Sequence, residues 1–381
     1  MMKKIIYICF SFILLFTLIP KPAIASPPVS ASSAILMDQN SGRVLYGKDP
    51  HEIKRIASIT KIMTAILAIE SDKLEDDVKI SDQAVRAEGS SIFLKPGEKM
   101  KLEDLVYGLM LRSGNDAAVA IAEHVGGSQD GFVLLMNQKA REIGMKNTHF
   151  ANPHGLDDHE NHFSTAYDMA LLTKYAMQNK KFRQISGTKV HRAPLPDSEW
   201  QRVWNNKNRL LTEKYEYCTG GKTGYTKRAK RTLVTTATKG DLDLIAVTLN
   251  APDDWNDHIG MFEYGFDQYH PKIIVSEGVI KKVKHPVYKN KVFVKNEYIY
   301  PLKPKEEKKI RVEYKMLKPK KQWEKGKNVP DTVGKVVIYF NESPVKTMPI
   351  YYKKGKQEEK KDWKSIWKNL FYIQLGVRNH G

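Results

Sequence analysis

Apolar and polar positions in the first half of the chain follow strand-like and then helix-like spacings. Two short apolar runs, residues 34–37 and 43–46, flank the turn at 40–42 and predict a β-hairpin. From Ile56 to Glu70 the apolar residues recur at helical spacing, and further helices are predicted over 102–111, 116–125 and 131–143. Residues 165–168 resemble a capping box, which predicts a helix through Met177.

Beyond residue 220 the pattern becomes that of strands. Residues 232–238 and 242–249 flank a short turn and predict an antiparallel pair, and an amphipathic helix is expected over 255–269. From about 270 to 352 apolar and polar residues alternate, with Pro and Gly between them and no helical period. The sequence therefore predicts an α/β (α+β) domain over 26–270 and a small all-β sandwich domain over 271–352.

The two ends of the chain have patterns of their own. Two lysines precede an apolar run from Ile5 to Ile19, and a small-residue cleavage pattern ends at Ala25, as in a secretory signal. The run is too short for a stable membrane span, and a lipoprotein signal is excluded because Cys9 lies inside it. After a charged linker over 353–361, residues 363–373 predict an amphipathic helix with an aromatic apolar face. We expect export and contact with the membrane surface; the alternative is that this face packs on the β domain.

Charge and cysteine content narrow the class of protein. Of the formal net charge of +19, residues 1–25 carry +3, residues 26–270 carry −1 and residues 271–381 carry +17. A basic C-terminal part favours an anionic surface of lipid headgroups or wall polymer, and export excludes nucleic acid. Cleavage after Ala25 leaves Cys218 as the single cysteine, so no intrachain disulfide is possible. We expect Cys218 to be a small packed side chain, because no activating partner is evident.

The segment Ser58-Ile59-Thr60-Lys61, at the start of the predicted 56–70 helix, is the first of three candidate motifs. A spacing of three places the hydroxyl and the amine on one helical face. A serine hydroxyl becomes a nucleophile when a base takes its proton, and a desolvated lysine can be that base. The helix N-terminus also offers a backbone N–H to an oxyanion. Alone the pattern is weak, because Ser-x-x-Lys occurs by chance in many helices.

Two further motifs follow after intervals of 55 and 109 residues. Ser113-Gly114-Asn115 lies between two predicted helices, where a hydroxyl and an amide can pass a proton and hold a substrate amide. Its alternative is an ordinary cap for the helix that begins at Asp116. Lys222-Thr223-Gly224 precedes the strand pair, where an edge strand can bind a substrate carboxylate and glycine allows close approach. Its alternative is an exposed lysine at a loop–strand junction.

The three motifs in this order are typical of penicillin-binding proteins and class A β-lactamases. The chain resembles the low-molecular-mass D-alanyl-D-alanine carboxypeptidases through residues 55–64, 111–118, 152–156 and 221–226. The resemblance covers 32–270, and more loosely the β domain with its C-terminal helix. Within the family it is greatest to sporulation-type enzymes of spore-forming Gram-positive bacteria, which trim cortex peptidoglycan. It implies a β-lactamase/transpeptidase-like catalytic domain, an antiparallel sheet flanked by helices.

The resemblance implies a role for each residue of the first two motifs. Ser58 would form the acyl-enzyme and release the terminal D-alanine of a peptidoglycan stem peptide, with Lys61 as its base. Ser113 would relay protons to the leaving amine, and Asn115 would hold the substrate amide. A β-lactam would acylate Ser58 and leave slowly. Neither a cofactor nor a catalytic metal is expected.

The third motif supplies the remaining implied contacts. Lys222 and Thr223 would bind the terminal carboxylate, and the backbone N–H groups of Ser58 and Tyr225 would form the oxyanion hole. The chain departs from the family near this motif. Ala229 is followed by Lys230-Arg231, whereas the family usually has a small Ala-Gly pair near the start of this strand, and Gly221 precedes Lys222 where the family more often has a larger apolar residue. These departures affect the rim of the site and the substrate preference, not the catalytic set.

Three other functions compete with this one. Zinc catalysis would use the ligand-rich cluster His154, Asp157, Asp158, His159, Glu160 and His162, although such loops are usually only solvated. A β-lactamase would need a second general base, for which Asp157, Asp158 or Glu160 could serve. A non-enzymatic wall-binding protein would require all three motifs to be accidents. The balance among carboxypeptidase, endopeptidase and transpeptidase activity stays open, because all share the acyl-enzyme.

Overall fold

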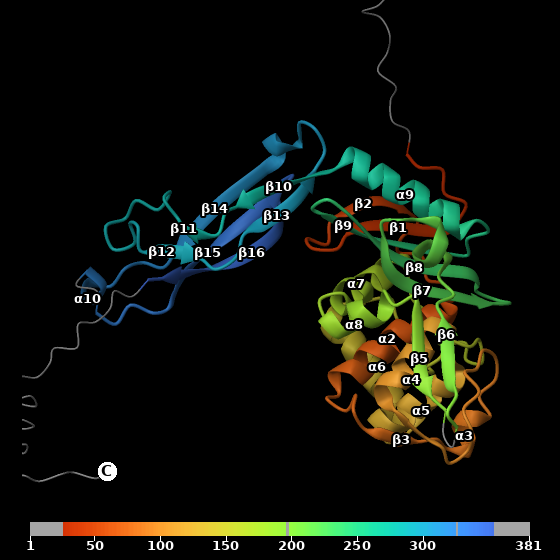
Figure 1. The fold of residues 1–381 in the computed structure, drawn as a ribbon. Coiled ribbons are helices and arrows are strands. Elements are labelled where there is room, and N and C mark those ends of the chain that lie inside the picture. Colours follow the sequence, from red (N-terminus) through yellow and green to blue (C-terminus); the bar gives the residue numbers. More distant parts are fainter. Residues whose placement is uncertain (1–25, 196–197, 325–326, 354–381) are drawn as a thin grey trace, which may run out of the picture. The chain divides into compact units, whose positions relative to one another are not determined.

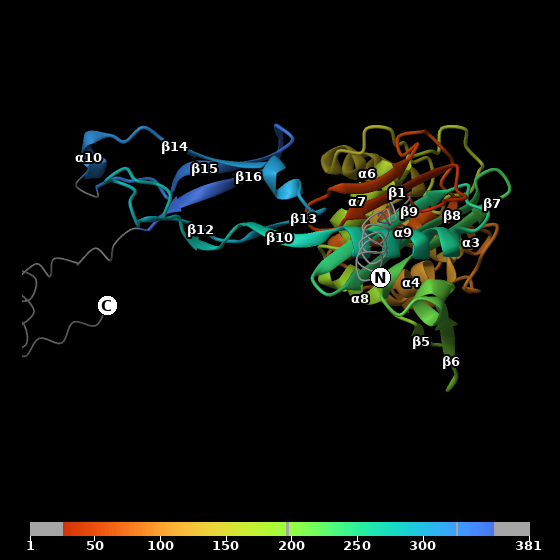
Figure 2. The same ribbon diagram turned by 90° about the horizontal axis from the view of Figure 1, so that it is seen from above.

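The computed structural model describes residues 26–195, 198–324 and 327–353. The chain divides into two compact units, with the division between Pro271 and Lys272 (Figures 1 and 2). The secretory signal expected over 1–25 and the amphipathic helix expected over 363–373 lie outside the described residues. No helix among the described residues has the length and apolar content needed to span a bilayer.

A five-stranded antiparallel sheet forms the centre of the first unit. Its strand order is β2-β1-β9-β8-β7, which places β7 at one edge. The bounds of these strands are β1 Ser33–Asp38, β2 Val44–Lys48, β7 Cys218–Thr226, β8 Lys230–Lys239 and β9 Leu242–Leu249. Two small hairpins accompany the sheet: β3 (Asp77–Lys79) with β4 (Lys99–Lys101), and β5 (Val190–Pro194) with β6 (Gln201–Asn205).

Helices cover both faces of this sheet. Helix α9 packs on one face, and α7 and α8 lie with the other helices on the opposite face (Figure 1). The helical segments are η1 Ala57–Thr60, α2 Lys61–Glu70, α3 Asp82–Val85, α4 Leu102–Arg112, α5 Asn115–Gly126, α6 Gln129–Ile143, α7 Ala166–Ala176, α8 Lys180–Ser186, η2 Leu210–Lys214 and α9 Asp254–Gln268. The fold that the sequence predicted for this domain, an antiparallel sheet flanked by helices as in β-lactamases and transpeptidases, is confirmed.

The apolar run in β1 is explained by the helices that cover both faces of the sheet. All six of its residues are buried. Ile35 and Met37 belong to the core shared with the helices, whereas Ala34 and Leu36 belong to the core shared with α9. A strand with two buried faces is apolar at consecutive positions, because successive side chains point to opposite sides of the sheet.

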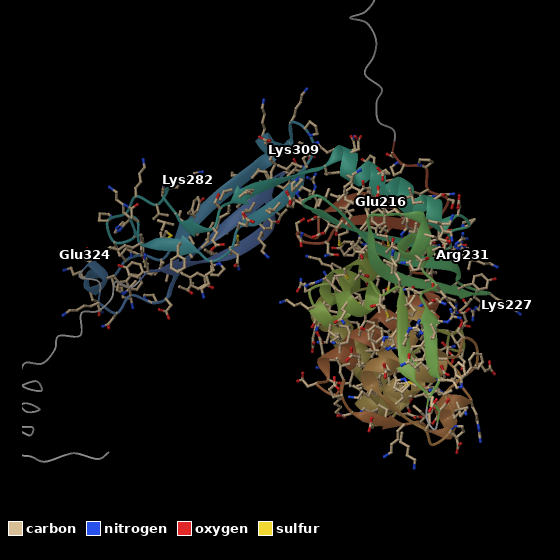
Figure 3. The ribbon with its side chains drawn as sticks, viewed as in Figure 1. Glu216, Lys227, Arg231, Lys282, Lys309 and Glu324 are labelled. Carbon is tan, nitrogen blue, oxygen red and sulfur yellow. The ribbon has the colours of Figure 1, made fainter. Side chains whose placement is uncertain are left out.

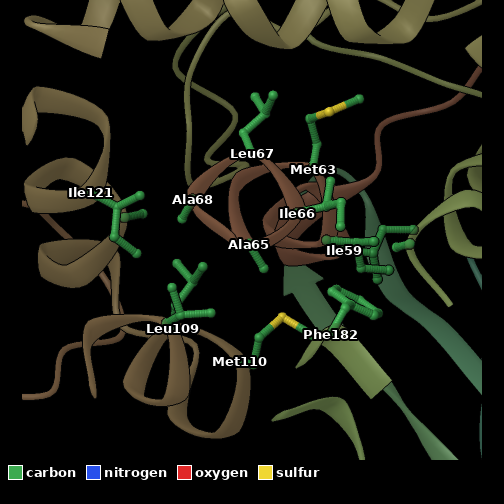
Figure 4. Packing of buried hydrophobic residues seen from close by; sticks show 14 of the residues in the cluster. Ile59, Met63, Ala65, Ile66, Leu67, Ala68, Leu109, Met110, Ile121 and Phe182 are labelled. Atoms are coloured by element: carbon green, nitrogen blue, oxygen red, sulfur yellow. The ribbon is translucent and has the colours of Figure 1, made fainter. Parts of the chain in front are cut away.

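Helix α2 runs through the middle of the helical layer. Residues 61–69 are all buried, so the helix is apolar around most of its circumference. Ala65 and Ala68 face Leu109 of α4 and Ile121 of α5, and Ile66 lies on the side of the helix toward Phe182 of α8 (Figure 4). This dense packing fixes the residue at which α2 begins, which is Lys61.

Most element boundaries predicted from the sequence hold, with one informative difference. The segment predicted as one helix from Ile56 is a 3₁₀ turn over Ala57–Thr60 followed by α2. The N-cap half of the predicted capping box is present, because the Thr165 hydroxyl accepts a hydrogen bond from the backbone N–H of Asp168, whereas the Asp168 carboxylate accepts from Asn147 and Thr148. The β3–β4 and β5–β6 hairpins and helix α8 have no counterpart in the sequence-based prediction.

The second unit consists of strands with two short helical segments. One sheet has the order β11-β12-β16-β15-β14, and a second pairs β10 with β13. Side chains from both sheets form one core, as expected for an all-β sandwich. The elements are β10 His270–Val275, β11 Gly278–Val279, β12 Val292–Val294, β13 Tyr298–Leu302, η3 Glu306–Lys309, β14 Ile310–Met316, α10 Lys321–Glu324, β15 Thr332–Phe340 and β16 Ser343–Tyr352.

Candidate active site

Ser58 lies on the 3₁₀ turn η1, directly before α2. A 3₁₀ helix has three residues per turn, so the side chains at i and i+3 eclipse each other. The Lys61 Nζ atom accordingly lies 3.0 Å from Ser58 Oγ. Ala57 precedes the serine with a φ of 50°, an uncommon backbone conformation for a residue with a Cβ. The turn thus presents the serine by a strained backbone rather than by a regular α-helix.

Lys61 is completely buried and surrounded by acceptors. Besides Ser58, its ammonium group donates to Asn115 Oδ1 at 2.7 Å and to the carbonyl oxygen of His154 at 2.6 Å. Burial, followed by the nearby charges of Lys222 and Lys207, holds the pKa of Lys61 well below its ordinary value. The amine can therefore lose its proton far below pH 10 and accept one from the Ser58 hydroxyl.

Ser113 ends α4 in the left-handed conformation, with a φ of 67°. The alternative of an ordinary helix cap is wrong, because α5 begins at Asn115 behind Gly114 and has no side-chain cap. Instead the Lys222 ammonium donates to Ser113 Oγ at 3.1 Å and to the carbonyl oxygen of Thr223 at 2.6 Å. Burial and the charge of Lys207 lower the pKa of Lys222 to about 7.

Strand β7 brings the third motif to the nucleophile turn from the sheet edge, as the sequence predicted. A Cβ atom on Gly224 would lie 3.0 Å from the backbone N of Ser58 and 3.1 Å from that of Ile59. The nearest atom to such a Cβ would be Thr232 Oγ1 of β8, so both the neighbouring strand and the turn favour glycine here. The Thr232 hydroxyl of β8 donates to the carbonyl oxygen of Ile56 at 2.9 Å and ties the turn to the sheet.

A cleft of about 300 Å³ opens above this arrangement. Of the seven predicted site residues, those that line the cleft are Ser58, Ser113, Thr223 and Tyr225, whereas Lys61, Asn115 and Lys222 are almost fully buried and are not among its lining residues. The structure thus brings all seven predicted residues together at one place. Asn115 also has partners within the protein on both sides of its amide: Oδ1 accepts from Lys61 and Nδ2 donates to the carbonyl oxygen of Glu88.

The rim of the cleft contains residues to which the sequence-based analysis assigned no catalytic or binding role. Arg231, opposite Tyr225 in the β7–β8 register, donates to Asp254 at 2.6 Å and lies 5.5 Å from the centre of the Trp255 ring. Figure 3 shows Arg231 and Lys227 at the end of the sheet where β7 turns into β8. Lys207, which follows β6, also lines the cleft. The sequence signalled only Arg231, as a departure from the family pattern.

The histidine- and acid-rich cluster, residues 154–162, does not assemble a metal centre. Among the described residues, no three His, Cys, Asp or Glu side chains are placed to hold a metal ion. Asp158 accepts from Asn152, and Glu160 pairs with Arg55 and Arg228. His162 lies 2.8 Å from the Thr60 hydroxyl, and burial lowers the pKa of its ring to about 3.

Cys218 is a buried free cysteine at the start of β7. Its thiol lies 3.6 Å from the carbonyl oxygen of Gly220, and burial raises the pKa of the thiol to about 11. A thiol in this state is not a nucleophile at neutral pH, in agreement with the packing role predicted for it.

Comparison with known proteins places this geometry among enzymes. The model of a family described as D-alanyl-D-alanine carboxypeptidase matches residues 21–253. The chain is 41% identical over 266 residues to the D-alanyl-D-alanine carboxypeptidase DacF of Bacillus subtilis, across 67% of each chain. It is 38% identical over 266 residues to DacC of Escherichia coli, across 64% of this chain and 63% of that protein.

Solved structures agree with the sequence relatives. The structure of penicillin-binding protein 5 from Haemophilus influenzae matches with a TM-score of 0.69 and 26% identity, over 87% of this chain and 99% of that one. The D-alanyl-D-alanine carboxypeptidase of Mycobacterium tuberculosis matches with a TM-score of 0.61 and 32% identity, over 65% of this chain and 95% of that one.

Proposed function

Because the chain belongs to the peptidase S11 family of D-alanyl-D-alanine carboxypeptidases, penicillin-binding proteins of peptidoglycan metabolism, we propose that Ser58 is its acyl-ester nucleophile. The substrate is a peptidoglycan stem peptide ending in D-alanyl-D-alanine, and the product is the peptide shortened by one D-alanine. The observation that carries this proposal is the 3.0 Å hydrogen bond between Ser58 Oγ and Lys61 Nζ, a buried amine whose pKa is lowered.

In the first step Lys61 accepts the proton of Ser58 as the hydroxyl oxygen attacks the carbonyl carbon of the penultimate D-alanine. The negative charge that develops on the carbonyl oxygen is met by the backbone N–H groups of Ser58 and Tyr225. Strand β7 passes close to the nucleophile turn at Gly224, directly before Tyr225. Thr223 lines the cleft on the same strand and receives the terminal carboxylate.

The leaving amine needs a proton when the peptide bond breaks. Ser113 Oγ lines the cleft and accepts from the Lys222 ammonium, so the serine can give its proton to the amine and recover one from the lysine. A pKa of about 7 suits Lys222 to this exchange at neutral pH. In this arrangement Lys222 acts from behind the cleft wall, and Asn115 positions Lys61.

After D-alanine has left, the proton that Lys61 took from Ser58 returns through solvent to Lys222, which leaves Lys61 neutral again. Water then attacks the ester, Lys61 takes the water proton, and Lys61 returns it to Ser58 Oγ as the shortened peptide leaves. A β-lactam acylates Ser58 in the same way and is cleared slowly. In support, the one carboxylate among the described lining residues of the cleft, Asp254, is paired with Arg231 and is not placed as a second base for that water. The β-lactamase alternative is therefore the weaker one.

The setting of the reaction follows from the same resemblance. We propose export by the segment 1–25, attachment to the outer face of the cytoplasmic membrane by the helix expected over 363–373, and a role in spore cortex maturation. The similarity to DacF supports the last of these. Binding of the full chain to anionic lipid vesicles, compared with a chain that ends at residue 353, tests the attachment.

One experiment tests the central proposal. The purified protein is incubated with a pentapeptide ending in D-alanyl-D-alanine and, separately, with a fluorescent penicillin. We expect the wild type and the exposed-serine control Ser343→Ala to release D-alanine and to take the label, and Ser58→Ala to do neither. Release or labelling at the wild-type rate by Ser58→Ala would refute the assignment. Peptide mapping of the labelled protein identifies the modified residue directly.

A further inference from the structure

The segment of residues 152–162, here the His154 loop, packs against the nucleophile turn, with Gly155 beside Ala57 and Thr60. Asn152 Oδ1 accepts from the backbone N–H groups of His154 and Gly155 and closes a tight turn. That turn directs the His154 carbonyl at Lys61, and the Pro153 carbonyl accepts from the Thr64 hydroxyl at 2.6 Å. The inner side of the loop is therefore part of the surroundings of the base.

The outer side of the loop is fastened by one carboxylate between two arginines. Glu160 accepts from Arg55 Nη2 at 2.6 Å, and from Arg228 Nη1 and Nη2 at 2.7 and 2.9 Å. Arg55 also donates to the His159 carbonyl, and the backbone N–H of Arg228 donates to Asp157. We name the three side chains of Arg55, Glu160 and Arg228 the Glu160 clamp.

The positions of the two arginines in the chain show which segments the clamp joins. Arg55 lies three residues before Ser58, and Arg228 lies three residues after Tyr225, in the turn that joins β7 to β8. The clamp thus connects the backbone just outside the two N–H groups assigned to the oxyanion hole. Within the site, a Cβ on Gly224 would lie 3.0 Å from the Ser58 backbone N, so β7 passes close to the nucleophile turn next to Tyr225.

We propose that Glu160 is a positioning residue for acylation: through Arg55 and Arg228 it holds the nucleophile turn and the end of β7 at the separation that the oxyanion requires. The inference rests on the proposed function of Ser58. Removal of the carboxylate would leave the two guanidinium groups with Asp157, whose Oδ1 lies 4.0 Å from Arg55 Nη1, as a more distant counter-charge. The repulsion between the guanidinium groups would then move the two backbones apart. Both Glu160 and Arg228 are solvent-exposed, with 77% and 47% of their side-chain surface accessible, so salt should weaken the clamp.

The test separates binding from the chemical step. Acylation by a β-lactam is measured by stopped flow over a range of concentrations, which gives the dissociation constant of the first complex and the rate constant of acylation. For Glu160→Gln we expect the rate constant to fall about 3- to 10-fold and the dissociation constant to change less than about 2-fold, because an oxyanion hole acts on the transition state. The control Glu75→Gln, which breaks the exposed pair with Lys101, should leave both constants unchanged.

Two further measurements distinguish positioning from general stability. Raising NaCl from about 0.05 to about 0.5 M should slow the wild type toward the variant and leave Glu160→Gln unaffected. The double variant Glu160→Gln/Arg228→Gln should be no slower than the slower single variant, because both remove the same contact. Wild-type acylation by Glu160→Gln, equal salt dependence of the two proteins, or fully additive effects would overturn the proposal. Its failure would leave the labelling of Ser58 in the wild type untouched, so the two proposals fail separately.

Discussion

Replacing Lys222 by methionine should stabilise the protein while it removes activity. The side chain is 2% exposed, and its ammonium group has two acceptors, Ser113 Oγ and the Thr223 carbonyl oxygen. Methionine has a similar length and no charge, so Lys222→Met keeps the packing and removes the buried ammonium. The loss of the proton source for Ser113 should slow acylation by about 10²-fold or more.

The expected gain in the free energy of unfolding depends on pH with a definite sign. Burial, with the charge of Lys207, lowers the pKa of Lys222 from 10.5 to about 7 on folding. Between these values the unfolded chain binds a proton that the folded protein does not, so wild-type stability rises with pH; below about 7 the full cost of the buried charge is present. At about 1.4 kcal/mol per pKa unit the cost is about 5 kcal/mol, and the two lost hydrogen bonds offset about 1 to 2 kcal/mol of the gain.

Urea denaturation at two pH values measures this effect. We expect Lys222→Met to be more stable than the wild type by about 3 kcal/mol at pH 6 and by less than about 1 kcal/mol at pH 9. The exposed control Lys101→Met should differ from the wild type by no more than about 0.5 kcal/mol at either pH. A variant that is less stable than the wild type at pH 6, or whose difference does not shrink toward pH 9, would show that the site does not hold a destabilised lysine.

Two further predictions concern the shape of the site and its response to acid. Gly155 has a φ of 87° and a Cβ there would meet the Ala57 carbonyl, so Gly155→Ala should slow penicillin labelling at least about 10-fold. The control Gly144→Ala, at a φ of 90° but in open space, should lower the free energy of unfolding by only about 1 kcal/mol and leave the rate of labelling unchanged. Burial lowers the pKa of three ring groups to about 3, those of His154, His162 and His258. Because the unfolded chain binds these protons below about 6.5, stability should fall with pH from there, and His258→Gln should reduce that slope by up to about 1.4 kcal/mol per pH unit in urea titrations between pH 6 and pH 4.

The sequence predicted the fold well wherever a hydrophobic period was long. The α4–α6 helices and the β8–β9 pair were found within a few residues, since each has a buried face with a regular period. The hairpin of β5 and β6 was missed because few of its side chains are buried: Ala193 and Trp204 are, but their neighbours are exposed. Its contact with α4 depends on stacking of His191 on Tyr107, which no local pattern contains.

The site was predicted in residue type and order, but not in orientation. Three motifs separated by 55 and 109 residues identified Ser58, Lys61 and Ser113 because the chemistry demands those groups. The sequence contained no signal for Lys207, which enters the cleft because the β5–β6 hairpin ends beside it. Nor did the residue spacing show that the Ser58 turn is a 3₁₀ helix. A single 3₁₀ turn and a single α-helical turn differ too little to change the pattern of apolar residues in the sequence.

The burial of Lys222 in the structure changes the interpretation of the third motif. A lysine that binds a substrate carboxylate must reach the cleft, but Lys222 is buried behind the wall and Thr223 is the member that lines it. We therefore predict that Thr223 and the one guanidinium among the described lining residues, that of Arg231, which donates to Asp254, contribute to recognition of the terminal carboxylate. Lys222 donates to Ser113 Oγ, and its charge adds to burial, the larger cause, in lowering the pKa of Lys61. We therefore predict that the lysine of the motif acts on both the nucleophile's base and the leaving group's proton donor from one buried position.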